Sequence, residues 1–324
     1  MLDIESIIAN VQPTLAHIEP DRLAYKKKSA TFISAIAIAV VASLLTGFIS
    51  DQIIPFAIAA GVVAIISGIV YAFTVGKLGA AYVEKFKSIV IPQVLKLIDP
   101  NLGYDAKRGI DRDTFNHSEL FTTNPDRYKT EDLVSGKFGD TFLQLAEIDA
   151  EERRTRTDSD GKSETYYVTI FDGLLLIADF HKEFHGRTFV FPDNAESSFG
   201  KLGRMFQKMA GRSGTKLVQL EDVEFEKAFA IYSNDEIECR YILSTAMMRR
   251  LLDMRSRFGQ KDIRFAFKDS CVWIAVPHPK TYLEPSTGRP STDPTQIRRM
   301  LEELKSFLDI IEEMSLNTRI WSKQ

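Results

Sequence analysis

The chain has 324 residues, of which 26% are charged and 44% hydrophobic, and its formal net charge at pH 7 is −3. Nucleic-acid-binding domains are usually strongly basic, so this balance excludes nucleic acid as the expected partner of the whole chain. The hydrophobic residues are unevenly distributed, because the longest uncharged runs lie between Ala30 and Val75.

Residues 1–29 form an N-terminal segment that we expect to be cytoplasmic and partly helical. Two uncharged runs follow, Thr31–Ser50 with 20 residues and Ile53–Val75 with 23. About 20 apolar residues suffice for a helix to cross a bilayer core. The Leu, Ile, Val and Phe residues of the first run favour insertion by roughly 3 to 6 kcal/mol. We therefore predict a transmembrane helical hairpin over residues 30–76, and reject a pair of buried helices in a soluble core.

Small residues recur at steps of three and four in both runs, which places them on one face of each helix. Such faces let helices approach closely in lipid. We expect them to form the interface within the hairpin: Ala35, Ala39, Ala42 or Ser43, and Thr46 in the first helix, and Ala57, Gly61, Ala64, Gly68 and Ala72 in the second.

Basic residues flank both outer ends of the hairpin and are absent from its tip. They are Arg22, Lys26, Lys27 and Lys28 before it, and Lys77, Lys85 and Lys87 after it. Cytoplasmic flanks carry the excess of Lys and Arg in membrane proteins. The sequence therefore predicts that both termini and the main domain lie in the cytoplasm.

A juxtamembrane helix is expected over residues 77–104, with Pro92 as a kink or break. From residue 105 to residue 324 the pattern predicts one cytoplasmic domain. Strand-like runs at residues 142–148, 166–171 and 174–180 favour a long hairpin with a charged tip, and Asp172-Gly173 suggests a bulge or bend. Residues 188–191 form a further short strand that Pro192 closes.

Helices are expected in the last third of the chain. Ser244 can cap a helix that Gly259 ends, and residues 263–267 and 271–276 resemble a hairpin. Asp293 caps the last helix, with Pro294 in its first turn and Gln296 at capping-box spacing. The apolar stripe of that helix comprises Ile297, Met300, Leu301, Leu304, Phe307, Leu308, Ile311 and Met314. The predicted fold class is α+β: a transmembrane hairpin, then a cytoplasmic domain of mainly antiparallel strands with flanking helices.

Several stretches after the hairpin resemble the bacterial family known as domain of unknown function 3137. They are Ala80–Tyr104, Ser118–Phe121, Tyr128–Ile148, Ile170–Asp193 with its FDG and FHGRTFVFPD motifs, Leu217–Leu251, and the LNTRIW segment at Leu316–Trp321. The resemblance implies a bacterial protein with paired transmembrane helices, here multi-pass in the inner (plasma) membrane. It implies no activity, cofactor or catalytic residue.

Isolated motifs in the sequence lack the spacing that catalysis or metal binding needs. His181 and His185 are spaced as two ligands on a helix, but Lys182 stands where a zincin has its glutamate. Asp111-Arg112-Asp113 and Asp158–Gly161 lack the full calcium-loop pattern, so we interpret them as turns. For Cys239 and Cys271 a disulfide is possible, but two free thiols are the better interpretation. We predict no catalytic, cofactor-binding or metal-ligating residues.

Residues 197–220 combine a basic side with an apolar side and contain no acid. The apolar side comprises Phe199, Leu202, Met205, Phe206 and Met209. A basic amphipathic segment can pack on its own domain, lie on anionic lipid headgroups, or bind a partner. The contact residues would be Lys201, Arg204, Lys208, Arg212 and Lys216.

The leading functional hypothesis is a membrane-tethered interaction or regulatory module with an unidentified protein partner. One alternative is a membrane-bound enzyme, such as a hydrolase, whose site assembles from dispersed acidic residues, with Glu119, Asp132, Asp172 and Asp179 as candidates. Another alternative is a module that senses anionic lipid through the basic segment.

Overall fold

A computed structural model describes residues 3–50, 53–157, 161–179, 185–193, 214–259, 262–277 and 283–321, the last nine of these by their backbone alone. The chain divides into two units. We call Asp3–Val94 together with Leu283–Arg298 the helical unit. Leu95–Tyr282 together with Arg299–Gln324 form the sheet unit.

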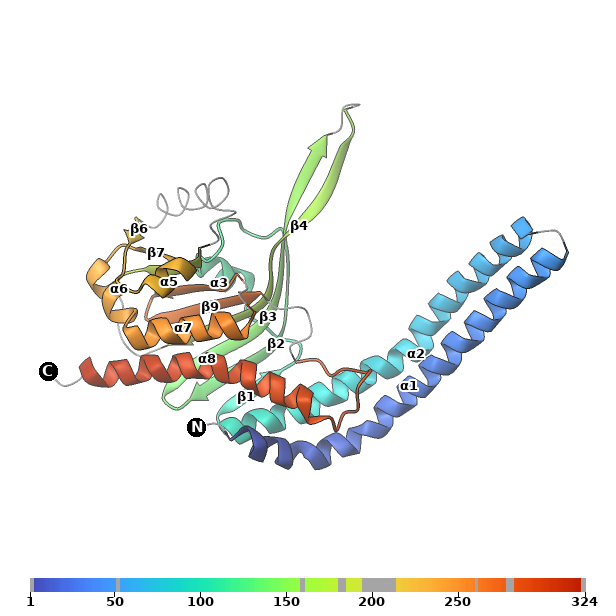
Figure 1. The fold of residues 1–324 in the computed structure, drawn as a ribbon, viewed down its shortest axis with the longest axis horizontal. Helices are drawn as coiled ribbons and strands as arrows, with labels where there is room; N and C mark the ends of the chain where they lie inside the picture. Colours follow the sequence, from blue (N-terminus) through green and yellow to red (C-terminus); the bar gives the residue numbers. More distant parts are fainter. Residues whose placement is uncertain are drawn as a thin grey trace. The chain divides into compact units, whose positions relative to one another are not determined.

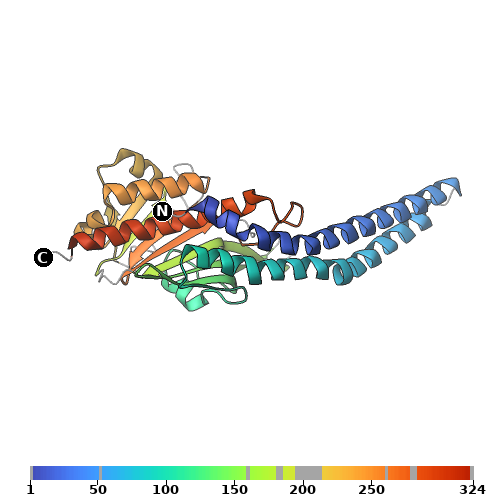
Figure 2. The same ribbon diagram turned by 90° about the horizontal axis from the view of Figure 1, so that it is seen from below.

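Two antiparallel helices build most of the helical unit, α1 (Ile4–Ile49) and α2 (Ile53–Ile98), with 46 residues each (Figures 1 and 2). Asp3 caps α1 by accepting a hydrogen bond from the backbone N–H of Ser6 at 3.1 Å. Helix α2 runs through Pro92 without a break, so the predicted juxtamembrane helix continues the second apolar run.

Both helices are long and apolar enough to cross a membrane. Only 6% of the most apolar 18-residue window of each is buried. Large apolar side chains are exposed there, including Phe48 at 74% and Ile49 at 84%. A helix in the core of a soluble protein would be mostly buried, and exposed apolar surface of this extent marks contact with lipid or with another protein.

The interface between α1 and α2 includes Ser43 of the predicted α1 face but differs from the prediction on the α2 side. A Cβ atom added at Gly61 or Gly68 would meet no atom within 4 Å, so these glycines do not face α1. Instead, large side chains of each helix meet small residues of the other, as Tyr25 of α1 does at Gly79 of α2. Phe56 packs against Gly47, whose added Cβ would lie 2.8 Å from the Phe56 Cβ, and Ser43 donates to the Phe56 carbonyl at 3.1 Å. A large side chain fitted against a small one closes the gap that two small faces would leave empty.

Residues Leu283–Arg298, here named the strap, belong to the helical unit although they are distant in sequence. The Ser291 N–H donates to Glu19 at 2.6 Å, and its Oγ lies 2.9 Å from the hydroxyl of buried Tyr82. Arg22, only 3% exposed, pairs with Glu19 and donates to the Thr287 carbonyl at 3.1 Å. The strap is thus bound to both helices by polar contacts.

In the part of the chain that the structure describes, nine strands form one sheet, and every strand pair is antiparallel. The sheet order is β1-β2-β3-β4-β9-β8-β5-β7-β6. The strands are β1 (Leu102–Asp105), β2 (Arg127–Phe138), β3 (Thr141–Thr157), β4 (Ser163–Asp179), β5 (Thr188–Pro192), β6 (Lys216–Val218), β7 (Phe229–Ser233), β8 (Arg264–Lys268) and β9 (Cys271–Pro277).

Helices cover both faces of this sheet, which confirms the α+β class. Figure 2 shows α7 (Thr245–Arg257) and α8 (Pro294–Trp321) on one side and the short α3 (Arg112–His117) on the other. Two further short helices, α5 (Val223–Ala228) and α6 (Glu236–Ile242), flank β7. Phe115 of α3 is 1% exposed and anchors a core that includes Ile148, Phe171 and Trp273. Alternate residues of each strand face opposite sides, so both faces are apolar.

Most of the predicted local signals are confirmed in the sheet unit. Ser244 caps α7 by accepting from Met247 N–H, and Gly259 follows that helix with a φ of +73°. Strands β8 and β9 form the expected hairpin. The predicted capping box at Gln296 is wrong, because this side chain accepts from the Ser286 N–H at 3.1 Å and donates to the Glu284 backbone carbonyl. The strap therefore uses the side chain that a capping box would need.

The long hairpin of β3 and β4 is also confirmed, with one correction. The ladder is irregular between Ala150 and Glu151, which lie opposite Phe171 and Thr169. The extra residue is therefore Ile170, and Gly173 pairs regularly with Ile148. The predicted bulge at Asp172-Gly173 is wrong because Gly173 lies in the middle of the sheet, paired with β3 on one side and β9 on the other.

Candidate functional site

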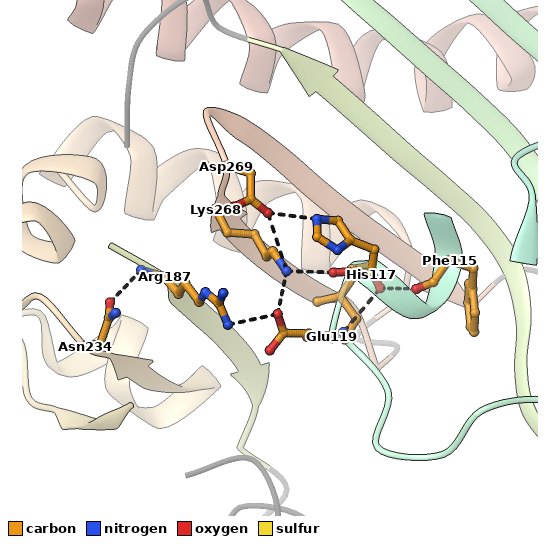
Figure 3. A network of polar contacts seen from close by, with 9 residues as sticks. Phe115, His117, Glu119, Arg187, Asn234, Lys268 and Asp269 are labelled. Atoms are coloured by element: carbon orange, nitrogen blue, oxygen red, sulfur yellow. Dashed lines mark hydrogen bonds and ion pairs between the residues drawn. The ribbon is translucent and has the colours of Figure 1, made fainter. Parts of the chain in front are cut away.

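A polar cluster surrounds Lys268, the last residue of β8, in the sheet unit (Figure 3). The side chain of Lys268 is completely buried. Its Nζ donates to Glu119 Oε1 at 2.5 Å and to the His117 carbonyl at 2.7 Å, and lies 3.5 Å from Asp269 Oδ2. The ammonium group therefore makes two hydrogen bonds and lies beside a second carboxylate.

The strand pattern explains why a lysine points inward here. Phe265 and Phe267 face one side of the sheet, and Ala266 and Lys268 face the side that α3 covers. The strand then ends in a tight turn that connects β8 to β9. Lys268 is thus fixed under the loop that follows α3, where Glu119 supplies the carboxylate.

The backbone around this cluster is strained. Glu119, Asp269 and Ser270 have φ values of 55°, 52° and 59°. A non-glycine residue in the left-handed region costs on the order of 1 to 3 kcal/mol, and such residues gather at functional or tightly held positions. We therefore treat the Lys268 cluster as the candidate site of the sheet unit.

The rim of the cluster is open to solvent. The imidazole Nε2 of His117 lies 2.9 Å from Asp269 Oδ2, and these side chains are 60% and 49% exposed. Arg187 Nη1 donates to Glu119 Oε1 at 3.2 Å, and the Arg187 backbone N–H donates to Asn234 at 2.6 Å (Figure 3). Lys268 of β8 and Arg187, the residue before β5, thus share the Glu119 carboxylate of the α3 loop.

The contacts of this cluster suit a structural role, joining the α3 loop to β8 and β5, better than a catalytic role. The Lys268 amine is buried, donates two hydrogen bonds and is paired with carboxylates, so it is not available as a nucleophile. A His–Asp pair can act as a base only beside a group that it deprotonates. Among the described residues, no hydroxyl or thiol forms a hydrogen bond with the His117 ring. The cluster therefore clamps the α3 loop onto the edge of β8 and β5.

A second feature of the sheet unit is an open hollow of about 700 Å³ over β2, β3 and β4. Two pairs of carboxylates lie directly opposite each other there, Glu131 with Glu147 and Asp149 with Asp172. Like charges in such positions repel, and Lys129, opposite Asp149, offsets part of that repulsion. Within the described ranges, no three His, Cys, Asp or Glu side chains are arranged to hold a metal ion.

The acidic residues suggested for an enzyme site lie in different surroundings. Asp172 lines the hollow, whereas Glu119 belongs to the Lys268 cluster. Asp132 is 1% exposed and accepts a hydrogen bond from the Tyr104 hydroxyl, and burial beside this carboxylate raises the pKa of Tyr104. Asp179 lies opposite Cys271 at the end of β4. Of these four residues, Asp172 is the one that lines a hollow in the described part of the chain. The enzyme hypothesis stays a prediction.

Other predicted positions can be placed as follows. Asp111 caps α3 by accepting from Thr114, as expected for a turn. The backbone N–H of His185 donates to Glu238 at 3.0 Å, and His181 lies outside the described residues. Of the basic segment, the described residue is Lys216, an exposed residue that opens β6. Lys201, Arg204, Lys208 and Arg212 lie outside the described residues, so their contact with lipid or a partner stays a prediction.

Both cysteines are free thiols, as predicted. Cys239 is buried, and burial raises the pKa of its thiol to about 11. Burial likewise raises the pKa of Cys271 to about 11, helped by the neighbouring Asp179. Because the thiolate is the nucleophilic form, neither cysteine is activated for catalysis at neutral pH.

A third feature is the outer part of the β3–β4 hairpin, which we name the arm. It comprises Glu152–Thr157 of β3 and Ser163–Val168 of β4, paired only with each other (Figure 1). Strand β2 leaves β3 at Glu151, and β9 leaves β4 at Gly173. Arg127 stacks at 3.3 Å on the Tyr167 ring at the base of the arm, and Tyr166 is 42% exposed.

Sequence reasoning identified the hairpin but not the Lys268 cluster or the arm. The signal for the arm was present, since the hairpin strands are longer than the neighbouring strands that could pair with them. Nothing local marks Lys268, because its partner Glu119 is distant in the sequence.

Comparison with known proteins confirms the family resemblance for part of the chain. Residues 169–316 match the model of a family described as a protein of unknown function, DUF3137. No curated protein and no solved structure matches the chain.

Proposed function

The family match names no activity, and we propose from the structure that this chain is a membrane-tethered interaction module whose arm contacts a protein partner. The observation that carries this proposal is the arm itself. A two-stranded ribbon is only marginally stable in water by itself, and here it extends past both neighbouring strands.

The surface of the arm suits a protein contact. Beyond β2 and β9 the two edges of the ribbon have no strand partner. On the β3 edge the Arg153 N–H donates to Asp126 at 2.7 Å, and the edge groups further out can pair with an added strand. Tyr and Arg are enriched among residues that dominate binding energy. The arm presents Tyr166 opposite Arg154, and Tyr167 opposite Arg153. Such pairs offer flat, amphipathic contact area without forming a core of their own.

We further propose that the chain is integral to a bacterial inner membrane, with both termini and the sheet unit in the cytoplasm. The support is the pair of exposed apolar helices and the basic residues that flank them. A green fluorescent protein fused after Gln324 is expected to fluoresce, and alkaline phosphatase at the same position to stay inactive. The opposite pattern would contradict this topology.

Site-specific photo-crosslinking in cells tests the role of the arm. Tyr166, 42% exposed, is replaced by a photoreactive phenylalanine in the full chain, and Tyr241, 57% exposed on α6, serves as the matched position. We expect one discrete light-dependent protein adduct from position 166 and none from position 241. Identical adducts from both positions would contradict a specific contact at the arm.

A shortened arm provides the second measurement. Glu152 and Val168 lie directly opposite each other, so an Asn-Gly turn can replace the residues between them. The partner identified by crosslinking should co-purify with the native chain in mild detergent and be lost from the shortened chain. An unchanged melting temperature would show that the fold is intact, and unchanged co-purification would rule the arm out.

A further inference from the structure

A groove of about 670 Å³ lies between α1 and α2 in the helical unit, at the end of the apolar runs. Lys27, Lys28, Thr31 and Phe32 line it from α1, and Thr74 and Val75 line it from α2. Its volume falls within the range of small-molecule sites, about 300 to 1,000 Å³. The groove is open on one side, so a ligand can enter from the surroundings of the helices.

The charge of the groove is positive, because its lining includes two lysines and no acid. Elsewhere in the helical unit, two lysines have acidic partners: Lys85 lies 2.6 Å from Asp21, and Lys87 lies 3.4 Å from Glu284. Among the residues that the structure describes, neither Lys27 nor Lys28 has an ion-pair partner. Two cations without a counter-charge beside one groove point to an anionic ligand.

The groove changes from polar to apolar along its length. Lys28 is the last charged residue before the uncharged run that begins at Ser29 and extends to Ser50. Phe32 and Ala35 lie further along α1, and Ala35 is about 10 Å from Lys28 at 1.5 Å rise per residue. Tyr71 packs beside Phe32, with ring centroids 5.6 Å apart, and its hydroxyl lies 2.8 Å from Ser29. Tyrosines with one polar end are typical of the level of lipid headgroups.

We propose that this groove binds one anionic phospholipid from the membrane, with the headgroup phosphate between Lys27 and Lys28 and an acyl chain along Phe32 and Val75. Basic pockets between transmembrane helices on the cytoplasmic side suit such headgroups. The proposal rests on the proposed membrane insertion, but not on the arm or its partner.

Native mass spectrometry of the full chain in detergent tests the proposal, with dioleoyl-phosphatidylglycerol as the probe and dioleoyl-phosphatidylcholine as the neutral comparison. Two double variants each remove two charges near the same end of the helices. K27Q/K28Q removes the lysines of the groove, and K26Q/K77Q removes lysines outside its lining. The first bound phosphatidylglycerol should dissociate about tenfold more readily from K27Q/K28Q. K26Q/K77Q should bind it like the native chain.

A third variant tests the apolar part of the groove. Ala35→Trp keeps both lysines and fills the groove, so it should also lose the first bound phosphatidylglycerol. Equal losses in the two lysine pairs, or equal binding of phosphatidylcholine by the native chain, would overturn the proposal. Competition by glycerol 3-phosphate as strong as by the lipid would also overturn it, because a soluble phosphate would then be the ligand. Failure of membrane insertion itself would appear separately, as extraction of the native chain from membranes by alkaline carbonate.

Discussion

Lys268 and Glu119 form an ion pair in which the two partners are unequally buried. The lysine side chain is 0% exposed and that of the glutamate 28%. Removing one partner of a buried pair leaves an uncompensated charge, which costs more than the pair itself contributes. Because Glu119 keeps contact with solvent and with Arg187, the loss of Lys268 is the milder of the two changes.

We therefore predict different costs for two single variants. Glu119→Gln leaves a buried ammonium with weaker acceptors and should lower the free energy of unfolding by about 3 kcal/mol. Lys268→Met should lower it by about 1 to 2 kcal/mol. Chemical denaturation of the purified full chain in detergent measures both values.

The double variant provides the control. If the pair interacts as the distances indicate, E119Q/K268M should cost less than the two single changes added together. Additive costs would mean that the two side chains do not stabilise each other.

At the scale of single elements, the pairing of β1 with β2 depends on Gly136. Its φ is +141°, and a Cβ atom placed there would lie 2.1 Å from the Asn101 carbonyl oxygen. That oxygen belongs to the backbone at the start of β1 and cannot move aside without breaking the register, in which Leu102 pairs with Gly136.

Gly136→Ala is therefore expected to lower the free energy of unfolding by more than about 2 kcal/mol, through strain and loss of the β1 edge. Gly103→Ala is the matched control on the partner strand, because its added Cβ would be at an ordinary 3.5 Å from the Ser135 carbonyl. Thermal unfolding of the two variants should separate them clearly. Equal melting temperatures would show that β1 is not held as the structure indicates.

The sequence runs account for the formation of the two long helices, whereas side-chain shape accounts for how they pack. Their length and apolar character come from the sequence, since no charge interrupts either run. Their contact surface depends on shape, because Phe56 fits against Gly47 and turns Gly61 and Gly68 away from α1. The spacing of small residues cannot show which face of α2 will contact α1, because the fit of a larger side chain decides it.

At the scale of the whole chain, the strap returns residues from near the C-terminus to the first helix. Ser291 donates to Glu19 across 272 positions of sequence. Hydrogen bonds from Arg22 and Ser291 lower the pKa of Glu19 from the usual 4.5 to about 2. A carboxyl group whose pKa is lowered by folding stabilises the folded state above its unfolded pKa and loses that effect as the pH falls.

The attachment of the strap should therefore weaken as the pH falls from about 4.5 to about 2. Limited proteolysis with pepsin over this range, followed by mass spectrometry, should show cleavage in residues 283–298 increasing as the pH falls. Glu19→Gln should remove most of this dependence, whereas Asp21→Asn, which alters a pair with Lys85 of α2 and no contact with the strap, should leave it nearly unchanged. Cleavage that does not vary with pH would contradict a role for Glu19.

The sequence alone determined the features that depend on neighbouring residues. Two uncharged runs determined the long apolar helices, alternating aromatic and branched residues determined the hairpins, and Ser244 and Asp293 determined where helices begin. Only the tertiary structure decided which distant residues meet. Glu119 contacts Lys268, Glu19 accepts a hydrogen bond from Ser291, and Lys27 and Lys28 line a groove beside α2. Folding brings these distant segments together, and no local sequence pattern marks which segments will pair. Contacts of this kind depend on the shape of the packed chain, which no single segment carries.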